Sequence, residues 1–382
     1  MSLLEQFFTS LPHEITCACC ELLDFFAPYN LDIYATGGGV RDLFFSQNPK
    51  DLDLEIHAIT PEKFDSLMQK IGAKGVGKSF FVYKWRGIDL SLPRRENKIA
   101  QGHRGFRVML AKTPKEAALR RDFTMNALML NLRTGELLDF FGALEDIKNR
   151  SLRVVNEKTF PEDSLRLLRA ARFCAQLDCD IFPHDLPLLR SMNIGDLSSE
   201  RIWLEMSLLL RAPHILKGID ALRLTALDEK LFQKPIDSAT YARIKTELTR
   251  AKSRENRTPT ACPHLLPLYL LWQFHFLSLE KILRTFPAMS LKEQRFLRLQ
   301  KRIPRRISER FLVGLSCQYP LNEWLGLYDS CILEQANSLG IALQSFTPST
   351  TPGELLAQGF TGKTLGDEWR KRRRAEVMKF VR

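Results

Sequence analysis

The chain has 382 residues, 45% of them hydrophobic and 26% charged, so it is long enough for two or three globular domains and its composition excludes general disorder. Lysine and arginine number 56 against 44 aspartate and glutamate. The resulting formal net charge of +12 favours a polyanionic partner. The most apolar run, Leu265 to Leu279, is too short and too interrupted to cross a bilayer, which predicts a core helix and no membrane partner.

Residues 1–30 contain acidic side chains but no lysine or arginine, so we expect neither a secretory signal nor a transit peptide and predict a cytoplasmic protein. A cytoplasmic setting keeps cysteines reduced. Cys17, Cys19 and Cys20 include one C-x-x-C spacing, but no second metal-binding pair accompanies it. We therefore predict buried helix thiols there and assign no metal to them.

Apolar spacing predicts two helices between Leu3 and Phe26, interrupted at Pro12. A mixed region of short strands, glycine turns and helices such as Pro61 to Ile71 follows, with a hairpin turn at Arg133 to Glu136. Beyond Pro161 the pattern predicts only helices, with a linker at Ala251 to Cys262 and a basic segment from Thr361 to Arg382. The expected strands are Ile33 to Ala35, Leu52 to Ile56, Phe80 to Trp85, Ile88 to Leu92 and Ala127 to Leu132.

Acidic and aliphatic residues alternate from residue 50 to residue 56. On a strand, Asp51, Asp53 and Glu55 would share one face, and Asp89 on a neighbouring strand would supply a third carboxylate. Oxygen-only ligands suit Mg²⁺, and two such ions activate a hydroxyl and stabilise a leaving pyrophosphate. The alternatives are the solvated face of an edge strand and a calcium loop, although Ile56 stands where that loop needs glycine.

A strand ending near Thr36 leads into Gly37, Gly38 and Gly39 and then into an expected helix. Glycines let the backbone approach a ligand closely, and amides at a helix start bind phosphate oxygens. Arg41 adds charged donors, so the segment predicts a triphosphate cradle. A dinucleotide fingerprint is excluded because Asp42 occupies the place of its third glycine.

Five motifs follow one another along the chain: Gly37-Gly-Gly-Val-Arg-Asp42, Pro49-Lys-Asp-Leu-Asp53, Arg120-Arg-Asp-Phe-Thr-Met-Asn-Ala127, Glu162-Asp-Ser-Leu-Arg-Leu-Leu-Arg-Ala-Ala-Arg-Phe173 and Ser198-Ser-Glu-Arg-Ile-Trp-Leu-Glu205. In this order they resemble a known family, the class II tRNA nucleotidyltransferases (CCA-adding enzymes) and the related bacterial poly(A) polymerases. The resemblance is dense from about Thr36 to Leu210.

This resemblance implies an α+β fold: a polymerase-beta-like nucleotidyltransferase head followed by an all-helical neck, body and tail. We place N-terminal helices at 1–30, the head at 31–155, the neck at 156–225, the body at 226–300 and the basic, tRNA-binding tail at 301–382. The resemblance implies metal binding by Asp51 and Asp53. It also implies ribose and triphosphate binding by Arg41, Arg120, Arg121, Asp122 and Asn126.

The neck motif also has a chemical interpretation of its own. With Pro161 in the first turn of a helix, Glu162, Asp163, Arg166 and Arg169 would form one stripe. Acceptors on Asp163 and donors on Arg166 match the pairing edges of cytosine and adenine, whereas uracil and guanine present the reverse pattern. A salt-bridged helix face is the alternative.

The sequence therefore predicts a Mg²⁺-dependent enzyme that adds C and A from CTP and ATP to the 3′ end of tRNA and releases pyrophosphate. A poly(A) polymerase, an A-only or C-only relative, and an inactive RNA-binding scaffold are the alternatives. Three positions depart from the family's usual glycines, namely Ser46, Phe81 and Ala143. No histidine–aspartate hydrolase motif occurs in the C-terminal half, and the sequence leaves the oligomeric state open.

Overall fold

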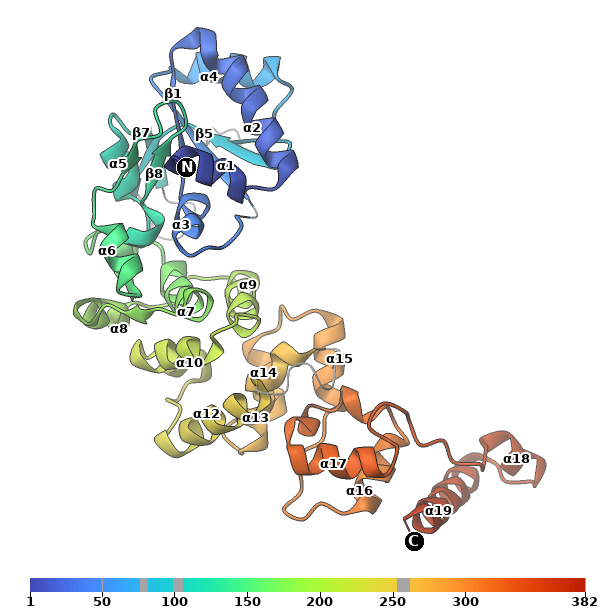
Figure 1. Ribbon diagram of the computed structural model, residues 1–382. Coiled ribbons are helices and arrows are strands. Elements are labelled where there is room, and N and C mark those ends of the chain that lie inside the picture. The colour runs from blue at the N-terminus through green and yellow to red at the C-terminus, as the bar shows by residue number, and fades with distance from the viewer. Residues whose placement is uncertain (50, 76–81, 99–105, 253–261, 382) are drawn as a thin grey trace. The chain divides into compact units, whose positions relative to one another are not determined.

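The computed structural model describes residues 1–49, 51–75, 82–98, 106–252 and 262–381. The chain divides into two compact units, Met1–Lys230 and Leu231–Arg382. The first unit holds a mixed sheet and a group of helices, and the described part of the second is helical (Figure 1). The predicted α+β class is therefore confirmed. The finer division into neck, body and tail stays a prediction.

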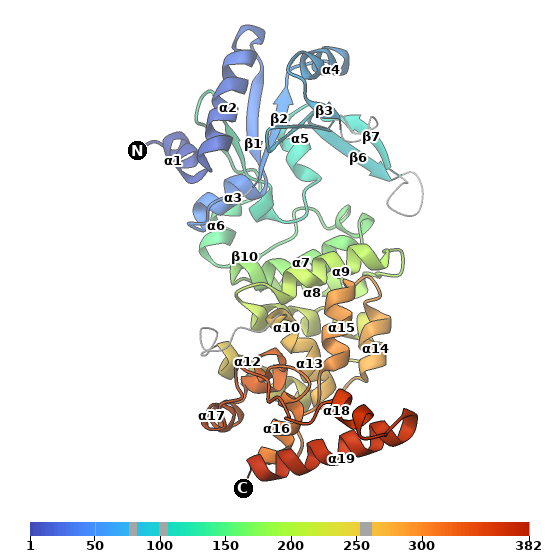
Figure 2. The same cartoon turned by 90° about the vertical axis from the view of Figure 1, so that its right-hand side faces the viewer.

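A seven-stranded sheet with the order β3-β4-β5-β2-β1-β8-β9 forms the framework of the first unit. Strand β2 is central, antiparallel to β1 and parallel to β5. A separate antiparallel hairpin, β6 with β7, projects from this sheet region (Figure 2). The head strands are β1 (Asp32–Thr36), β2 (Leu52–His57), β3 (Lys74–Gly75), β4 (Val82–Trp85), β5 (Ile88–Ser91), β6 (Arg94–Lys98), β7 (Phe106–Leu110), β8 (Met129–Asn131) and β9 (Leu137–Leu138).

The alternating pattern produces β2 as expected. Leu52, Leu54 and Ile56 are almost fully buried in the core, because successive side chains of a strand point to opposite faces. Asp53, on the opposite face, is exposed. The predicted hairpin turn is confirmed, since the Asn131 side chain accepts two backbone amide hydrogen bonds at the end of β8. Strands β3, β6 and β7 were not predicted, and Phe80 and Phe81 lie outside the described residues.

Both predicted N-terminal helices are present, and a capping box between Ser2 and Glu5 begins the first. The predicted helix at residue 61 begins after Thr60, whose hydroxyl caps it, with Pro61 in the first turn. The head helices are α1 (Leu3–Ser10), α2 (His13–Phe26), α3 (Gly38–Phe44), α4 (Pro61–Lys70), α5 (Pro114–Leu119) and α6 (Ala143–Lys148).

The sequence pattern predicted only helices beyond Pro161, and this prediction was wrong in part. β10 (Ser151–Leu152) and β11 (Asp180–Ile181) form a short parallel pair. The helix expected from Pro161 begins only at Leu165, after a 3₁₀ turn over Phe160–Glu162. The helices of this part are α7 (Leu165–Leu177), α8 (Leu186–Ser191), α9 (Ser199–Leu210), α10 (Ile215–Leu224) and α11 (Leu227–Phe232), the last of which contains the division between the units.

The second unit has its own core around Trp324, with Leu312, Val313 and Val377 packed in the same cluster. The prediction of one core helix from Leu265 to Leu279 was wrong. Helix α13 ends at Gln273, and the chain turns at His275, which has a left-handed backbone conformation. Its helices are α12 (Ser238–Lys252), α13 (Leu266–Gln273), α14 (Leu279–Thr285), α15 (Leu291–Leu299), α16 (Glu309–Ser316), α17 (Ser330–Ser338), α18 (Pro352–Ala357) and α19 (Gly362–Phe380).

The predicted linker and the absence of a membrane-spanning helix can be compared only with the described residues. The expected linker overlaps the end of α12, and its residues 253–261 lie outside the described residues. Among the helices that the structure describes, none is both long and apolar enough to span a membrane.

Candidate active site

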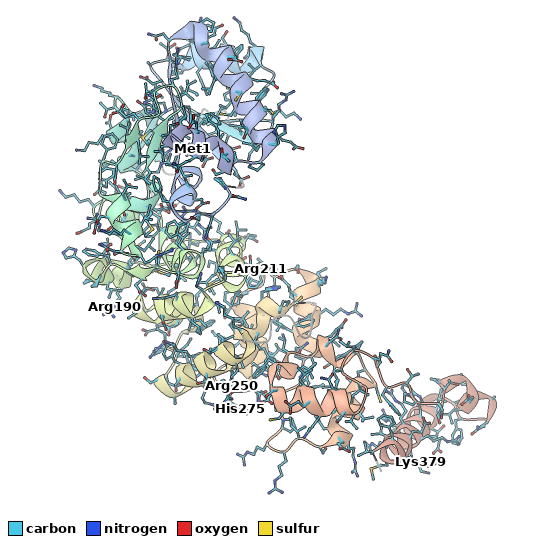
Figure 3. The ribbon with its side chains drawn as sticks, viewed as in Figure 1. Met1, Arg190, Arg211, Arg250, His275 and Lys379 are labelled. Atoms are coloured by element: carbon cyan, nitrogen blue, oxygen red, sulfur yellow. The ribbon has the colours of Figure 1, made fainter. Side chains whose placement is uncertain are left out.

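A cavity of about 1290 Å³ lies in the first unit, lined by the glycine turn, the start of β2, the segment after α5, and α7 with the end of α9. Nine arginines line it and no described lysine does, while seven lining residues are acidic. This excess of guanidinium groups suits a ligand with several phosphates. The lining arginines are Arg41, Arg94, Arg120, Arg121, Arg166, Arg169, Arg172, Arg201 and Arg211, the last of which is labelled in Figure 3.

The carboxylates predicted for metal binding gather at one end of this cavity. Asp51 directly precedes β2 and Asp53 is its second residue, and both line the cavity. Asp89 on β5 lies opposite Asp53 in the parallel register, as predicted from sequence. Its Oδ1 is 3.0 Å from Lys84 Nζ. Across the described residues, no salt bridge or hydrogen bond involves the carboxylate of Asp51 or Asp53, although the Asp53 carbonyl accepts from the Thr36 hydroxyl at 3.5 Å.

The negative charge around Asp53 is compensated only in part. Surrounding protein atoms displace water and raise the pKa of Asp53; Arg121 opposes this, while Asp89, Asp51 and Glu55 raise the pKa further. A bound cation would relieve that repulsion. Three carboxylates with oxygen donors fit a hard divalent ion, which would polarise a phosphoryl oxygen and lower the pKa of a bound hydroxyl.

The glycine turn lies beside these carboxylates. Gly37 has a φ of 68°, and a Cβ there would lie 2.8 Å from Arg121 Nη1 and 3.8 Å from Asp53 Oδ2. Only glycine avoids both the strain and the clash. Gly38 and Gly39 form the first turn of α3 and line the cavity.

Arg41, predicted to hold phosphates, is buried and already bonded within the protein. Its Nε is 2.8 Å from Asp42 Oδ1, and its Nη1 is 2.6 Å from Asn126 Oδ1. The guanidinium also lies 5.2 Å from the centre of the Phe173 ring. Arg41 thus ties the glycine turn to the following motif as well as lining the cavity. After α3, Ser46 keeps a left-handed φ of 52° at the position where the resembled family has glycine.

Asp122 is the centre of a buried hydrogen-bond network. Its Oδ2 is 2.7 Å from Arg169 Nε, and its Oδ1 accepts from Asn126 Nδ2 at 2.9 Å and from the Phe123 amide at 2.8 Å. Burial alone would raise the pKa of Asp122, but Arg169 and these hydrogen bonds outweigh burial and lower it to about 2. The predicted motif residues are therefore brought together, with Asp122 held ionised.

The neck residues occupy the cavity wall, but not as the predicted helical stripe. Asp163 is extended and precedes α7, and its Oδ1 accepts from the Leu165 amide at 3.1 Å. Arg166 Nη1 donates to the Thr159 carbonyl at 3.0 Å and Nη2 donates to the Arg120 carbonyl at 2.7 Å. The stripe was wrong because a side-chain cap at Asp163 starts the helix four residues after Pro161.

Sequence reasoning assigned no role to several residues of this wall. Arg201 Nη2 lies 3.4 Å from Asp163 Oδ1, and Arg172 pairs with the buried Glu205 at 2.7 Å. Desolvation lowers the pKa of Arg172 to about 10, against the opposing effect of Glu205. The motif from Ser198 to Glu205 was the available signal, since it contains two of these side chains.

Glu157, His184 and Asp185 form a second group with metal-binding side chains, whose ligand atoms lie within 4.8 Å of one another. Glu157 and His184 are exposed, and Asp185 already accepts the Val154 amide at 2.7 Å. None of the three lines the cavity. Exposed acidic clusters of this kind commonly hold no ion, and we assign none here.

Comparisons with known proteins give the same picture. Residues 33–153 match the family described as the poly A polymerase head domain. A multifunctional CCA protein of Psychromonas ingrahamii is 35% identical over 234 residues, covering 56% of each chain. One from Stenotrophomonas maltophilia is 37% identical over 187 residues, covering 46% of this chain and 45% of that protein.

Solved structures share the fold over the whole chain. A CCA-adding enzyme in complex with CTP superposes with a TM-score of 0.70 at 19% identity, covering 100% of this chain and 95% of the other. The Thermotoga maritima CCA-adding enzyme complexed with tRNA gives 0.69 at 20% identity, with the same coverage. Identities this low establish the fold alone.

The fold is that of the CCA-adding enzyme structures, and residues 33–153 resemble a poly A polymerase head domain. The matches confirm the predicted resemblance of this chain to the class II CCA-adding enzymes. Enzymes with such heads generally use a divalent metal. The chain spans about half the length of the curated relatives that it matches.

Proposed function

We propose that this protein is a template-independent nucleotidyltransferase that uses CTP and ATP to build or repair the CCA end of tRNA in the cytoplasm. The observation that carries the proposal is the register of Asp53 against Asp89, with Asp51 and Asp53 lining an arginine-rich cavity. Carboxylates at one end and guanidinium groups along the walls suit a metal-bound nucleoside triphosphate. Relatives named as CCA proteins support the choice of substrate.

The proposed roles follow the geometry. Asp51 and Asp53 hold Mg²⁺, and Asp89 completes the carboxylate cluster. The glycine turn with Gly38 and Gly39 approaches the phosphates. The RNA 3′ hydroxyl attacks the α-phosphorus, its proton leaves to solvent or a carboxylate, and the bond to pyrophosphate breaks. The arginines that balance charge on the triphosphate and the leaving group are Arg41, Arg120 and Arg121.

On the opposite wall, Asp163 and Arg166 read the base. The two backbone carbonyls that Arg166 contacts use two of its five N–H donors and fix the plane of the guanidinium. Asp122, Asn126 and Arg169 form a rigid support beside the ribose. We further propose a neck at 156–225, a body at 226–300 and a tRNA-binding tail at 301–382.

One assay separates this function from its alternatives. The purified protein is incubated with tRNA lacking CCA, tRNA ending in C or CC, and a generic oligoribonucleotide, each with one labelled nucleotide. Incorporation of both C and A into the tRNAs alone supports the proposal. Addition of only one nucleotide indicates a partial-specificity enzyme, A tails on the oligoribonucleotide indicate a poly(A) polymerase, and no addition with retained tRNA binding indicates an inactive scaffold.

A further inference from the structure

Glu55 is a buried carboxylate to which the proposed reaction gives no role. Its side chain is only 2% exposed. Its Oε1 accepts from Arg121 Nη2 at 2.7 Å and from Arg120 Nη2 at 3.2 Å, and its Oε2 lies 3.5 Å from His57 Nε2. Two guanidinium groups therefore share one oxygen. These charges lower the pKa of Glu55 despite its burial, so the side chain is ionised.

Arg121 connects this buried pair to the carboxylate cluster. Its other terminal nitrogen, Nη1, lies 2.8 Å from the Cβ position of Gly37, and Asp53 Oδ2 lies 3.8 Å from the same position. The guanidinium thus lies beside both the glycine turn and Asp53, yet it forms a salt bridge with Glu55 and none with Asp53. Burial raises the pKa of Asp53 and the charge of Arg121 opposes that rise, so the two groups interact electrostatically.

Glu55 itself is poorly placed to bind the metal. It is on β2 two residues after Asp53 but is buried, whereas Asp53 is exposed and opens on the cavity. Asp89 is the carboxylate in register with Asp53. The three acidic residues at and just before β2 therefore have two different surroundings. Among the described residues, Asp51 and Asp53 have no cationic partner in a salt bridge, and Glu55 pairs with two arginines.

We propose that Glu55 is a positioning residue that holds Arg121 at the glycine turn and away from Asp53, leaving Asp53 available to the divalent cation. The inference rests on the proposed function. Without Glu55, the Arg121 guanidinium has Asp53 as its nearest open carboxylate and competes with the metal for it. Arg120 binds the same oxygen of Glu55, but the three atoms nearest the Gly37 Cβ position belong to Arg121 and Asp53, so Arg120 offers a matched comparison.

Binding of Mn²⁺, a spectroscopic substitute for Mg²⁺, tests the proposal on the full chain without nucleotide. Electron paramagnetic resonance gives the Kd for the wild type, Glu55→Gln, Glu55→Gln with Arg121→Gln, and Glu55→Gln with Arg120→Gln. We expect the single variant to bind about tenfold more weakly. Removing Arg121 as well should restore binding to within about threefold of wild type, whereas removing Arg120 should restore much less, although both double variants have the same net charge.

Asp65→Asn is the control, because Asp65 on α4 accepts a hydrogen bond from Tyr83 on β4 and does not line the cavity. It should bind Mn²⁺ as the wild type does. Unchanged binding in Glu55→Gln, or equal recovery in the two double variants, would overturn the proposal. Circular dichroism accompanies each measurement; if Glu55→Gln does not fold, the two double variants are compared directly, and equal affinities again overturn the proposal.

The experiment also separates this proposal from the proposed function. If the wild type binds Mn²⁺, Asp53→Ala abolishes that binding, and tRNA still receives no nucleotide, the proposed function fails while the role of Glu55 is decided by the double variants. If the wild type adds nucleotides but the double variants recover equally, the function stands and the positioning role fails.

Discussion

The carboxylates on two sides of the cavity have opposite electrostatic surroundings. We compare the sheet side, with Asp51 and Asp53, with the helical side, with Asp122 and Arg169. On the sheet side, Asp51 and Asp53 form no salt bridge among the described residues, and their crowding contributes to the raised pKa of Asp53. On the helical side, Asp122 is saturated by Arg169, Asn126 and a backbone amide, and its pKa is lowered to about 2. A bound cation would therefore relieve the repulsion between the sheet-side carboxylates. The Asp122 carboxylate on the helical side has its hydrogen-bond partners without any ligand.

This difference suits the sheet side to the chemical step and the helical side to recognition of the nucleotide. A wall with uncompensated carboxylates binds and activates through a cation, whereas a wall of bonded side chains has little freedom and can hold a fixed hydrogen-bond pattern. Arg166 illustrates the second case, since two backbone carbonyls fix its guanidinium. We therefore expect substitutions on the sheet side to reduce the rate, and substitutions on the helical side to change selectivity or stability.

The largest effect should come from the sheet side. Asp53→Ala or Asp51→Ala removes a proposed metal ligand, worth several kcal/mol in the transition state, so nucleotide addition should fall by about a thousandfold or more. Neither side chain packs in the core, so the melting temperature should change little. Single-turnover assays with CTP measure the rate, and thermal denaturation followed by circular dichroism measures the melting temperature. Activity retained in either variant contradicts the metal assignment.

Selectivity should change on the helical side. Asp163→Ala removes the acceptor for the amino groups of cytosine and adenine, and hydrogen bonds to charged groups contribute about 1.5 to 3 kcal/mol, so kcat/KM should fall roughly ten- to a hundredfold. UMP incorporation should rise relative to CMP because the repulsion of uracil's carbonyl is lost. Arg201→Gln is the matched control, since it removes the cation beside Asp163 but keeps the acceptor. An equal decrease for all four nucleotides would make Asp163 structural.

The sequence predicted the sheet-side wall better than the helical one, for a physical reason. Alternation along a strand depends only on neighbouring residues, so residues 51–56 predicted which side chains face the core and that Asp51 and Asp53 lie on the other face. The burial of Glu55 could not be predicted, because its partners Arg120 and Arg121 follow 65 and 66 residues later. Local patterns do not encode such distant ion pairs.

On the helical side, the motifs predicted which residues belong to the site, but they did not predict the backbone conformation of those residues. Pro161 is a valid first-turn residue, yet Asp163 caps a helix that begins at Leu165, and the two possibilities have similar local propensities. The β10–β11 pair was missed because strands of two residues have no detectable periodicity. The cavity itself arises only from the packing of segments distant in sequence.

Acid stability tests the claim that the helical wall is complete. A lowered pKa means that Asp122 stabilises the fold above the unfolded value of about 3.8 and that this contribution is lost as the pH falls toward 2. The shift corresponds to about 2 kcal/mol at neutral pH. Asp122→Asn should therefore destabilise the protein by at least about that amount at pH 7, and the difference from wild type should narrow between pH 4 and pH 2.

Urea denaturation followed by circular dichroism at several pH values measures this difference. Asp65→Asn is the control, because Asp65 accepts a hydrogen bond from a tyrosine hydroxyl and has no salt-bridge partner in the part of the chain that the structure describes. A constant difference between Asp122→Asn and the wild type across this pH range would show that Asp122 does not depend on its charge, and the contrast between the two walls would lose its electrostatic basis.

The smallest expected effect concerns RNA affinity, which neither wall should control. Lys371 and Arg374 are exposed on α19, whereas Val377 of the same helix packs in the core of the second unit, so truncation would remove packing together with charge. Substituting Lys371→Gln and Arg374→Gln removes charge alone, because glutamine has a similar helix propensity. If both contact phosphates, the slope of log Kd against log salt should decrease by roughly 1.4 to 1.8, and tRNA affinity should fall severalfold at low salt.

Asp53→Ala measured in parallel should keep the wild-type slope. An unchanged slope in the α19 variant would assign the phosphate contacts to other basic residues, and a changed slope in Asp53→Ala would show that the sheet-side wall takes part in RNA binding after all.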